Sequence, residues 1–163
     1  MKYYVVFDTN VLVSAALKND SVPGLTVQLA FDGPIIPVLN EEIEREYREV
    51  LSRPKFHLTD DIIADILSQF QEQGIYVDAD PLDIDLPDPK DLVFYEVVME
   101  EKKEHDAFLV TGNIKHFPEK PFIVTPRELL DIVLADIDDY ENDMTAGADS
   151  KEEAFGNDEG DSI

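Results

Sequence analysis

The stretch YYVVFDTN, residues 3–10, joins an apolar run to three small polar residues. Residues 3–7 are all β-branched or aromatic, which predicts a strand buried on both faces of a parallel sheet. Asp8, Thr9 and Asn10 follow at once, and these residue types are favoured helix N-caps. They also supply oxygen ligands at the carboxyl end of a strand, where parallel α/β sheets bind their ligands. The stretch alone leaves both interpretations open.

Further apolar runs alternate with amphipathic segments along the chain. Residues 125–128 (TPRE) match a capping box with proline at the first helical position. Strands that alternate with helices predict an α/β domain with a mainly parallel sheet. Further strands are expected at residues 35–38, 75–77, 107–110 and 121–124, and helical patterns cover residues 11–17, 21–31, 40–54, 59–73, 92–102 and 125–136.

The length of 163 residues suits one domain that buries roughly two thirds of its unfolded surface. No apolar stretch approaches the roughly 20 residues that a membrane span needs, and we expect a soluble, cytoplasmic protein without membrane contacts. The chain has no cysteine, which excludes disulfides and thiolate metal sites.

The formal net charge of −24 is unevenly distributed. Residues 136–163 hold 11 acidic residues and one lysine, while the remaining 135 residues hold 26 acidic and 12 basic ones. Because apolar patterning fades beyond about residue 139, we expect a folded domain at 1–138 and a disordered acidic tail at 139–163. Such a charge alone argues against nucleic-acid binding, which normally relies on Lys and Arg.

Acidic residues occur at several positions that the predicted fold would bring together. Asp88 and Asp91 precede the helix at 92–102, where the helix N-terminus favours negative charge. Asn113 follows the strand at 107–110, two residues after Thr111, so it ends a strand as Asp8 does. Three glutamates, Glu42, Glu46 and Glu49, share one face of the helix at 40–54.

Taken singly, each acid has an ordinary explanation as a cap, a turn residue or a solvated surface charge. Taken jointly, they suit a hard divalent cation such as Mg²⁺ or Mn²⁺, which prefers oxygen ligands. Two-metal nucleases use clustered carboxylates in this way to cleave phosphodiesters. Without a cation, two charges 4 Å apart repel by about 4 kcal/mol at an effective dielectric of 20, so raised pKa values are expected.

Four segments in this order resemble a PIN-domain nuclease of the toxin branch of toxin–antitoxin systems. They are VVFDTNVLVSAAL, EEIEREYREVLSRPKF, DPKDLVFYEVV and HDAFLVTGNIKHFP, and the similarity extends from about Tyr3 to Leu134. The resemblance implies a three-layer α/β/α fold with a central, mainly parallel sheet. It also implies metal-dependent cleavage of RNA, with Mg²⁺ or Mn²⁺ as cofactor and a small antitoxin as partner. A homodimer is a further expectation from the same resemblance.

The resemblance assigns the catalytic positions residue by residue. Asp8, Glu46 and Asp91 match three acidic metal ligands, and Glu42 is the alternative to Glu46 if the register shifts by one turn. Asp88 is a less favoured alternative to Asp91.

Supporting roles and capping follow from the same assignment. Asn10 and Thr111 are expected to support the site, with Thr9 as an alternative to Asn10. Helix capping would then fall to Thr9 or Asn10.

The fourth catalytic position falls on Asn113, where many PIN domains carry Asp. An amide offers an oxygen but brings no charge to a cation, so a catalytically weak or inactive PIN-fold module is the alternative function. Asp106 precedes the strand at 107–110 and is expected at the opposite end of the sheet. A haloacid-dehalogenase-type phosphatase fits less well, because a second Asp would be expected at Asn10.

Contacts with an RNA substrate are poorly specified by the sequence. Scattered basic side chains could reach phosphate groups, but isolated surface cations seldom have a specific role. The aromatic residues fall within apolar strand and helix patterns and are expected in the core. The basic candidates are Arg48, Arg53, Lys55, Lys115, His116 and Lys120.

Overall fold

The structure is a computed structural model that describes residues 2–161, with side chains as far as residue 146. Residues up to Leu130 form one compact unit, and residues from Asp131 onward form a second. The strands are β1 (Tyr3–Phe7), β2 (Ile35–Leu39), β3 (Ile75–Tyr76), β4 (Ala107–Val110) and β5 (Ile123–Val124). The α-helices are α1 (Thr9–Leu17), α2 (Val22–Asp32), α3 (Glu41–Leu51), α4 (Asp60–Gln73), α5 (Leu92–Glu101) and α6 (Pro126–Asp161), and the 3₁₀ turns are η1 (Pro54–Phe56), η2 (Pro89–Asp91) and η3 (Ile114–His116).

The five strands form one sheet in the order β3-β2-β1-β4-β5, and every neighbouring pair is parallel. The central strand β1 is deeply buried, and Val5, Val6 and Phe7 are completely inaccessible to solvent. This burial explains why residues 3–7 are apolar without alternation. The predicted α/β class and parallel sheet are confirmed.

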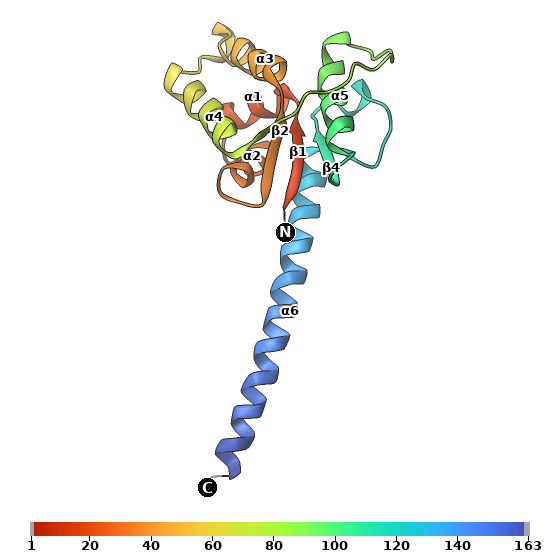
Figure 1. The fold of residues 1–163 in the computed structure, drawn as a ribbon. Coiled ribbons are helices and arrows are strands. Elements are labelled where there is room, and N and C mark those ends of the chain that lie inside the picture. Colours follow the sequence, from red (N-terminus) through yellow and green to blue (C-terminus); the bar gives the residue numbers. More distant parts are fainter. Residues whose placement is uncertain (1, 162–163) are drawn as a thin grey trace. The chain divides into compact units, whose positions relative to one another are not determined.

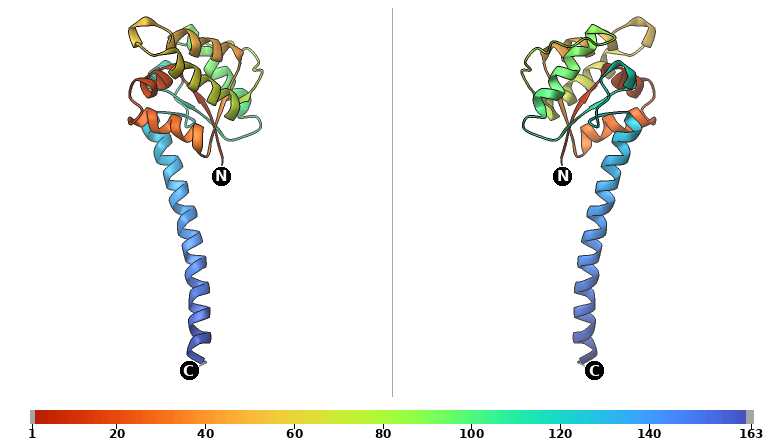
Figure 2. Two further views of the ribbon diagram at one scale, coloured as in Figure 1. Left: turned by 90° about the vertical axis from the view of Figure 1, so that its left-hand side faces the viewer. Right: turned by 90° about the vertical axis from the view of Figure 1, so that its right-hand side faces the viewer.

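Helices flank this sheet, as Figures 1 and 2 show. The chain moves from β1 to β2 to β3 in one direction and then returns across β1 to β4. Because parallel crossovers are right-handed, α1 to α4 lie on one side of the strands and α5 on the other. The direction of winding therefore reverses between β1 and β4, and ligands of open α/β sheets bind at such a switch point.

An aromatic cluster fixes the elements around this point. The ring of Phe70 on α4 lies 5.3 Å from that of Phe7 and 5.9 Å from that of Tyr47. Tyr47 on α3 is also 6.5 Å from Phe94 on α5. All four residues are almost fully buried, so the end of β1, α3 and α5 are held against one another by the core.

Two predicted helix caps are present. The Asn40 side chain accepts a hydrogen bond from the Ile43 backbone at 2.9 Å at the start of α3. Thr125 and Glu128 form the reciprocal pair of a capping box, with both bonds at 3.2 Å. These local signals therefore set the starts of α3 and α6 as the sequence predicts.

The second unit contains most of α6. The helix continues to Asp161, and every side chain from Asp138 to Ala146 is exposed. The backbone is therefore helical across the predicted boundary at residue 139, while the disorder expected for 139–163 stays a prediction for the chain in solution. Among the residues that the structure describes, no helix is both long enough and apolar enough to cross a membrane.

Candidate active site

Asp8 lies at the switch point, directly after β1. It occupies the N-cap position of α1, but its carboxylate makes no capping hydrogen bond. Instead its Oδ2 accepts hydrogen bonds from Thr111 Oγ1 at 2.8 Å and from Asn10 Nδ2 at 3.2 Å. The side chain is only 5% exposed. Asp8 is therefore held as a buried charge rather than used as a cap.

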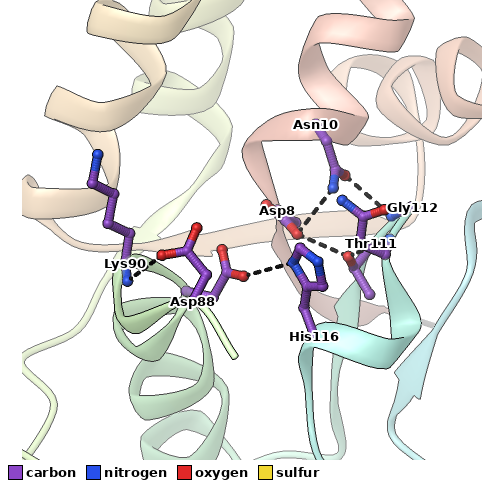
Figure 3. A network of polar contacts seen from close by, with 9 residues as sticks. Asp8, Asn10, Asp88, Lys90, Thr111, Gly112 and His116 are labelled. Atoms are coloured by element: carbon purple, nitrogen blue, oxygen red, sulfur yellow. Dashed lines mark hydrogen bonds and ion pairs between the residues drawn. The ribbon is translucent and has the colours of Figure 1, made fainter. Parts of the chain in front are cut away.

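Asn10 and Thr111 tie the ends of β1 and β4 together around Asp8. Asn10 Oδ1 accepts from the Gly112 backbone at 3.1 Å, and Thr111 Oγ1 accepts from the Asn113 backbone at 2.9 Å (Figure 3). Both residues thus contact Asp8 and also order the loop after β4. The expectation that Thr9 or Asn10 caps α1 is wrong, because no side chain caps this helix.

Glu46 reaches the same region from α3. Its neighbour Tyr47 is completely buried and donates a hydrogen bond to the Phe7 carbonyl at 2.5 Å, which fixes α3 against the end of β1. Thr9 Oγ1 then donates to Glu46 Oε2 at 2.5 Å. Glu42, one turn earlier, is exposed. The structure therefore brings Glu46, and not Glu42, to the residue that follows Asp8.

Asp91 enters from the third direction, at the end of η2 and the start of α5. Its side chain is 13% exposed, and its Oδ2 lies 3.1 Å from His116 Nδ1. Asp88 has a different contact, since its carboxylate accepts from the Lys90 backbone at 3.0 Å and caps η2. Asp91 is thus a half-buried acid that contacts His116, whereas Asp88 caps the η2 turn.

The three acids influence one another electrostatically. Burial raises the pKa of Asp8 to about 6, against the lowering effect of the Thr111 hydrogen bond, and the charge of Asp91 raises it further. Burial is also the largest cause of the raised pKa of Glu46, to which Asp8 adds, and of the raised pKa of Asp91, to which Asp88 and Glu46 add. The pKa values of all three acids are thus raised, with burial as the largest cause and the neighbouring carboxylates as a smaller one.

The carboxylates nevertheless do not close into a tight cluster. Among residues 2–161, no group of three or more His, Asp or Glu side chains is close enough to bind one metal ion together. Like-charge repulsion of a few kcal/mol opposes closer approach when no cation is present. The three carboxylates therefore raise one another's pKa without forming a closed cluster.

Asn113 differs from the three acids in its surroundings. It is exposed and begins η3, and it lines a small cavity of about 220 Å³ with Asn10, Ser14 and Gly112. This side of the switch point carries no charged side chain in the cavity lining. The strand-end position predicted for Asn113 is correct, but its side chain does not join the Asp8 network through a described hydrogen bond.

A groove of mixed charge adjoins Glu46. Arg45, Arg53 and Lys90 line this groove of about 310 Å³ together with Glu42, Glu46 and Glu49, and Arg53 lies 3.9 Å from Glu49. The charge of Lys90 lowers the pKa of Glu46, which places the ammonium group within electrostatic range of the acids. Three cationic side chains thus lie beside Glu46 together with three glutamates, in a chain with a net charge of −24.

Two acids at the amino edge of the sheet, Glu101 and Asp106, each contact a nitrogen-bearing side chain. Glu101 is 3% exposed, and its Oε1 lies 2.6 Å from His105 Nδ1. Asp106 lies 3.8 Å from Lys102, at the start of β4 and thus at the edge opposite Asp8, as predicted. We refer to Glu101, Asp106 and their partners as the paired edge.

A comparison with known protein families gives one match. The family described as "PIN domain" matches residues 4–115, which is more than half of the chain and includes Asp8, Glu46, Asp91 and Asn113. The chain belongs to the PIN domain family. PIN domains are a nuclease family whose members generally use divalent metals. No curated protein and no solved structure matches the chain.

Three contributors to this PIN-domain site are not found from the sequence. The local patterns indicate Thr9 only as a helix cap or as support for Asp8, Tyr47 only as an apolar-face residue, and His116 only as a scattered basic side chain. The signal for Tyr47 is its position beside Glu46 on a helix that must pack on β1. The contacts of Thr9 and His116 join segments 37 and 25 residues apart, and no local pattern reports such distances.

Proposed function

We propose that this PIN domain is a metal-dependent endoribonuclease. The observation that carries the proposal is that Asp8, Glu46 and Asp91 converge on the switch point from β1, α3 and η2. Each acid has a raised pKa, and another member of the trio contributes to each shift. A site that accumulates uncompensated negative charge is suited to binding a cation.

Asp8, Glu46 and Asp91 would hold Mg²⁺ or Mn²⁺, since the donor set consists of hard carboxylate oxygens. The cation would activate water and stabilise the leaving oxygen of a phosphodiester. Thr111 and Asn10 hold Asp8 by its Oδ2 atom, and Thr9 holds Glu46. These hydrogen bonds fix the orientation of the ligands before the cation arrives.

The RNA strand would enter along the groove beside Glu46, where Arg45, Arg53 and Lys90 are the side chains that can contact phosphate. Phosphate contacts provide most of the sequence-independent affinity for nucleic acids. This groove adjoins Glu46 directly, whereas the cavity around Asn113 is uncharged. Cationic side chains of the groove would thus contact the RNA on one side of the scissile phosphate. Uncharged polar side chains around Asn113 would contact it on the other side.

Cleavage of a labelled single-stranded RNA by the purified protein tests the proposal. Cleavage is expected with Mg²⁺ or Mn²⁺, and it should stop with EDTA and return when metal is restored. Glu46→Gln should abolish it, while Glu42→Gln, one turn away on the same helix and exposed, should retain it. Cleavage that persists in EDTA, or that needs Glu42 and not Glu46, would contradict the assignment.

A catalytically inactive PIN-fold binding module is the second candidate. Two observations favour it: Asn113 supplies no charge at the fourth position, and the three acids do not form a closed metal cluster among the described residues. Under this alternative the protein would bind a non-cleavable RNA but would cleave none of the RNAs tested at millimolar Mn²⁺. Detectable cleavage that depends on Asp8 would exclude it.

We also propose that the protein acts as the toxin of a toxin–antitoxin pair, with a small antitoxin as partner, and that it forms a homodimer. The support is the ordered resemblance of the four quoted segments to that branch of PIN domains. Expression of the wild-type chain should arrest growth, and Asp8→Asn should relieve the arrest. Light scattering after gel filtration would measure the mass of the assembly, and a monomer mass would refute the homodimer.

A further inference from the structure

His116 forms a contact that the proposed function leaves unexplained. The residue ends η3, and its Nδ1 lies 3.1 Å from Asp91 Oδ2, across a separation of 25 residues. An ionised carboxylate only accepts hydrogen bonds, so the imidazole nitrogen is the donor in this contact when Asp91 is charged. Figure 3 labels His116 and marks this contact with a dashed line from its ring.

A chain of contacts links His116 back to Asp8. The His116 backbone donates to the Asn113 carbonyl at 2.9 Å, which closes the η3 turn. The Asn113 backbone donates to Thr111 Oγ1 at 2.9 Å, and that hydroxyl donates to Asp8 at 2.8 Å. The loop after β4 therefore contacts Asp8 at its beginning and Asp91 at its end.

We propose that His116 is a positioning residue for Asp91 in the metal site. The imidazole holds Oδ2 of Asp91, so that the carboxylate keeps a fixed orientation toward Asp8. Hydrogen bonds to ligating side chains orient the ligands of metal sites, and their loss typically weakens metal binding by 10- to 100-fold. The inference rests on the proposed function, because it assumes that Asp91 is a ligand.

The loop after β4 thus contributes a hydrogen-bond donor where an acid would be expected. Asn113 brings no charge to the site, but the η3 turn that it begins delivers His116 to Asp91. Three acids with one oriented by an imidazole would then replace an arrangement of four acids. The expected result is a site with fewer charges and a more rigid geometry.

His105 provides a matched control in the same chain. Its Nδ1 also contacts a carboxylate, Glu101, at 2.6 Å, but this pair belongs to the paired edge. Its ring stacks on Tyr4 with centroids 3.9 Å apart. His105 and Glu101 therefore form a histidine–carboxylate pair at the other end of the strands, where the His105 ring packs on Tyr4.

Titration calorimetry with Mn²⁺ alone tests the inference on the full chain. We expect His116→Ala to weaken Mn²⁺ binding by 10- to 100-fold. His116→Gln should recover part of the affinity, since an amide N–H can replace the donor. His105→Ala should leave the Mn²⁺ affinity unchanged and lower the midpoint of thermal unfolding.

Three results would overturn the inference. Wild-type affinity retained within about twofold in both His116 variants would show that the contact does not orient a ligand. Tighter Mn²⁺ binding in His116→Ala would show that the imidazole competes with the cation. If the wild-type protein itself bound no Mn²⁺, the proposed function would fail, and the inference would fail with it. Should His116→Ala not fold, the comparison of wild type with His116→Gln decides alone.

Discussion

The acidic side chains at the two edges of the sheet have different hydrogen-bond and ion-pair partners. At the amino edge, Glu101 is buried against His105, and Asp106 lies beside Lys102. At the carboxyl edge, Asp8 is buried with hydrogen-bond donors that carry no charge, and neighbouring carboxylates raise its pKa and that of Glu46. Asp106 thus has a lysine partner and Glu101 an imidazole partner, whereas Asp8 and Glu46 are hydrogen-bonded to the uncharged side chains of Thr111, Asn10 and Thr9. We propose that this difference marks the carboxyl edge as the functional one.

The largest expected difference between the edges is in catalysis. Asp8→Asn should reduce RNA cleavage by about 10³-fold, because charge stabilisation by a bound metal contributes several kcal/mol to the transition state. Glu101→Gln removes an equally buried carboxylate from the paired edge and should leave the rate per folded molecule within severalfold. Gel assays at matched concentrations of folded protein would measure both. An equal loss in the two variants would show that burial, rather than position, determines the effect.

The second difference concerns stability and its dependence on pH. The folded-state pKa of Asp8 is about 6, against an ordinary value of 3.8. The folded state therefore binds this proton more readily than the unfolded state, and stability falls as pH rises through the interval from about 4 to 6. By linkage, the charged form costs up to about 3 kcal/mol above this interval. In EDTA at pH 8, Asp8→Asn should be more stable than wild type and should show a flatter pH dependence.

Urea unfolding at pH 4.5 and pH 8 would measure this effect. Glu101→Gln is the control, and it should destabilise the protein by about 1 to 3 kcal/mol because it disturbs a buried hydrogen bond. Stabilisation by Glu101→Gln, or destabilisation by Asp8→Asn at pH 8, would reverse the contrast between the edges.

Much of the fold follows from the sequence, because its signals are local. The apolar run at 3–7, the caps at Asn40 and Thr125, and the alternation of strands with helices all predict what the structure contains. The strand-end pattern also places Asp8 and Asn113 correctly. The positions of Glu46 and Asp91 need the family resemblance, since a helix face alone does not separate Glu46 from Glu42.

What the sequence could not provide is the set of long-range hydrogen bonds. The contacts Thr9–Glu46, Tyr47–Phe7 and His116–Asp91 join separate elements. They depend on how α3 packs against the end of β1 and on how η3 approaches η2 rather than on any periodic pattern. Asp8 illustrates the limit: its residue type and position fit a cap as well as a metal ligand, while its hydrogen-bond partner Thr111 lies 103 residues away.

The third expected difference concerns RNA affinity. Replacing Arg45, Arg53 and Lys90 together by Gln should weaken binding of a single-stranded RNA to the Asp8→Asn protein. The slope of log K against log salt should fall by about 0.7 for each phosphate that the groove no longer neutralises. Replacing Lys102, Lys103 and Lys120 removes the same charge away from the groove and should leave the slope unchanged. Equal slopes for both triple variants would contradict the proposed entry groove.

The smallest expected effect is at Asn113. Asn113→Asp adds a negative charge at an exposed position, where one charge pair contributes about 0.2 to 1 kcal/mol. Mn²⁺ binding should therefore tighten by about two- to fivefold in calorimetry. Weaker binding would show that the amide itself serves the site and that Asn113 is more than a missing acid.

The most direct test of the contrast between the edges is thermal unfolding at increasing Mn²⁺ concentration, at neutral pH. The midpoint of wild type should rise by mass action, with a stabilisation of about 2.7 kcal/mol when Mn²⁺ reaches 100 times its dissociation constant. Glu101→Gln should start from a lower midpoint and show the same rise, whereas Asp8→Asn should show none. A wild-type midpoint that does not respond to Mn²⁺, or a rise of equal size in Asp8→Asn, would contradict the claim that the carboxyl edge is built to hold a divalent cation.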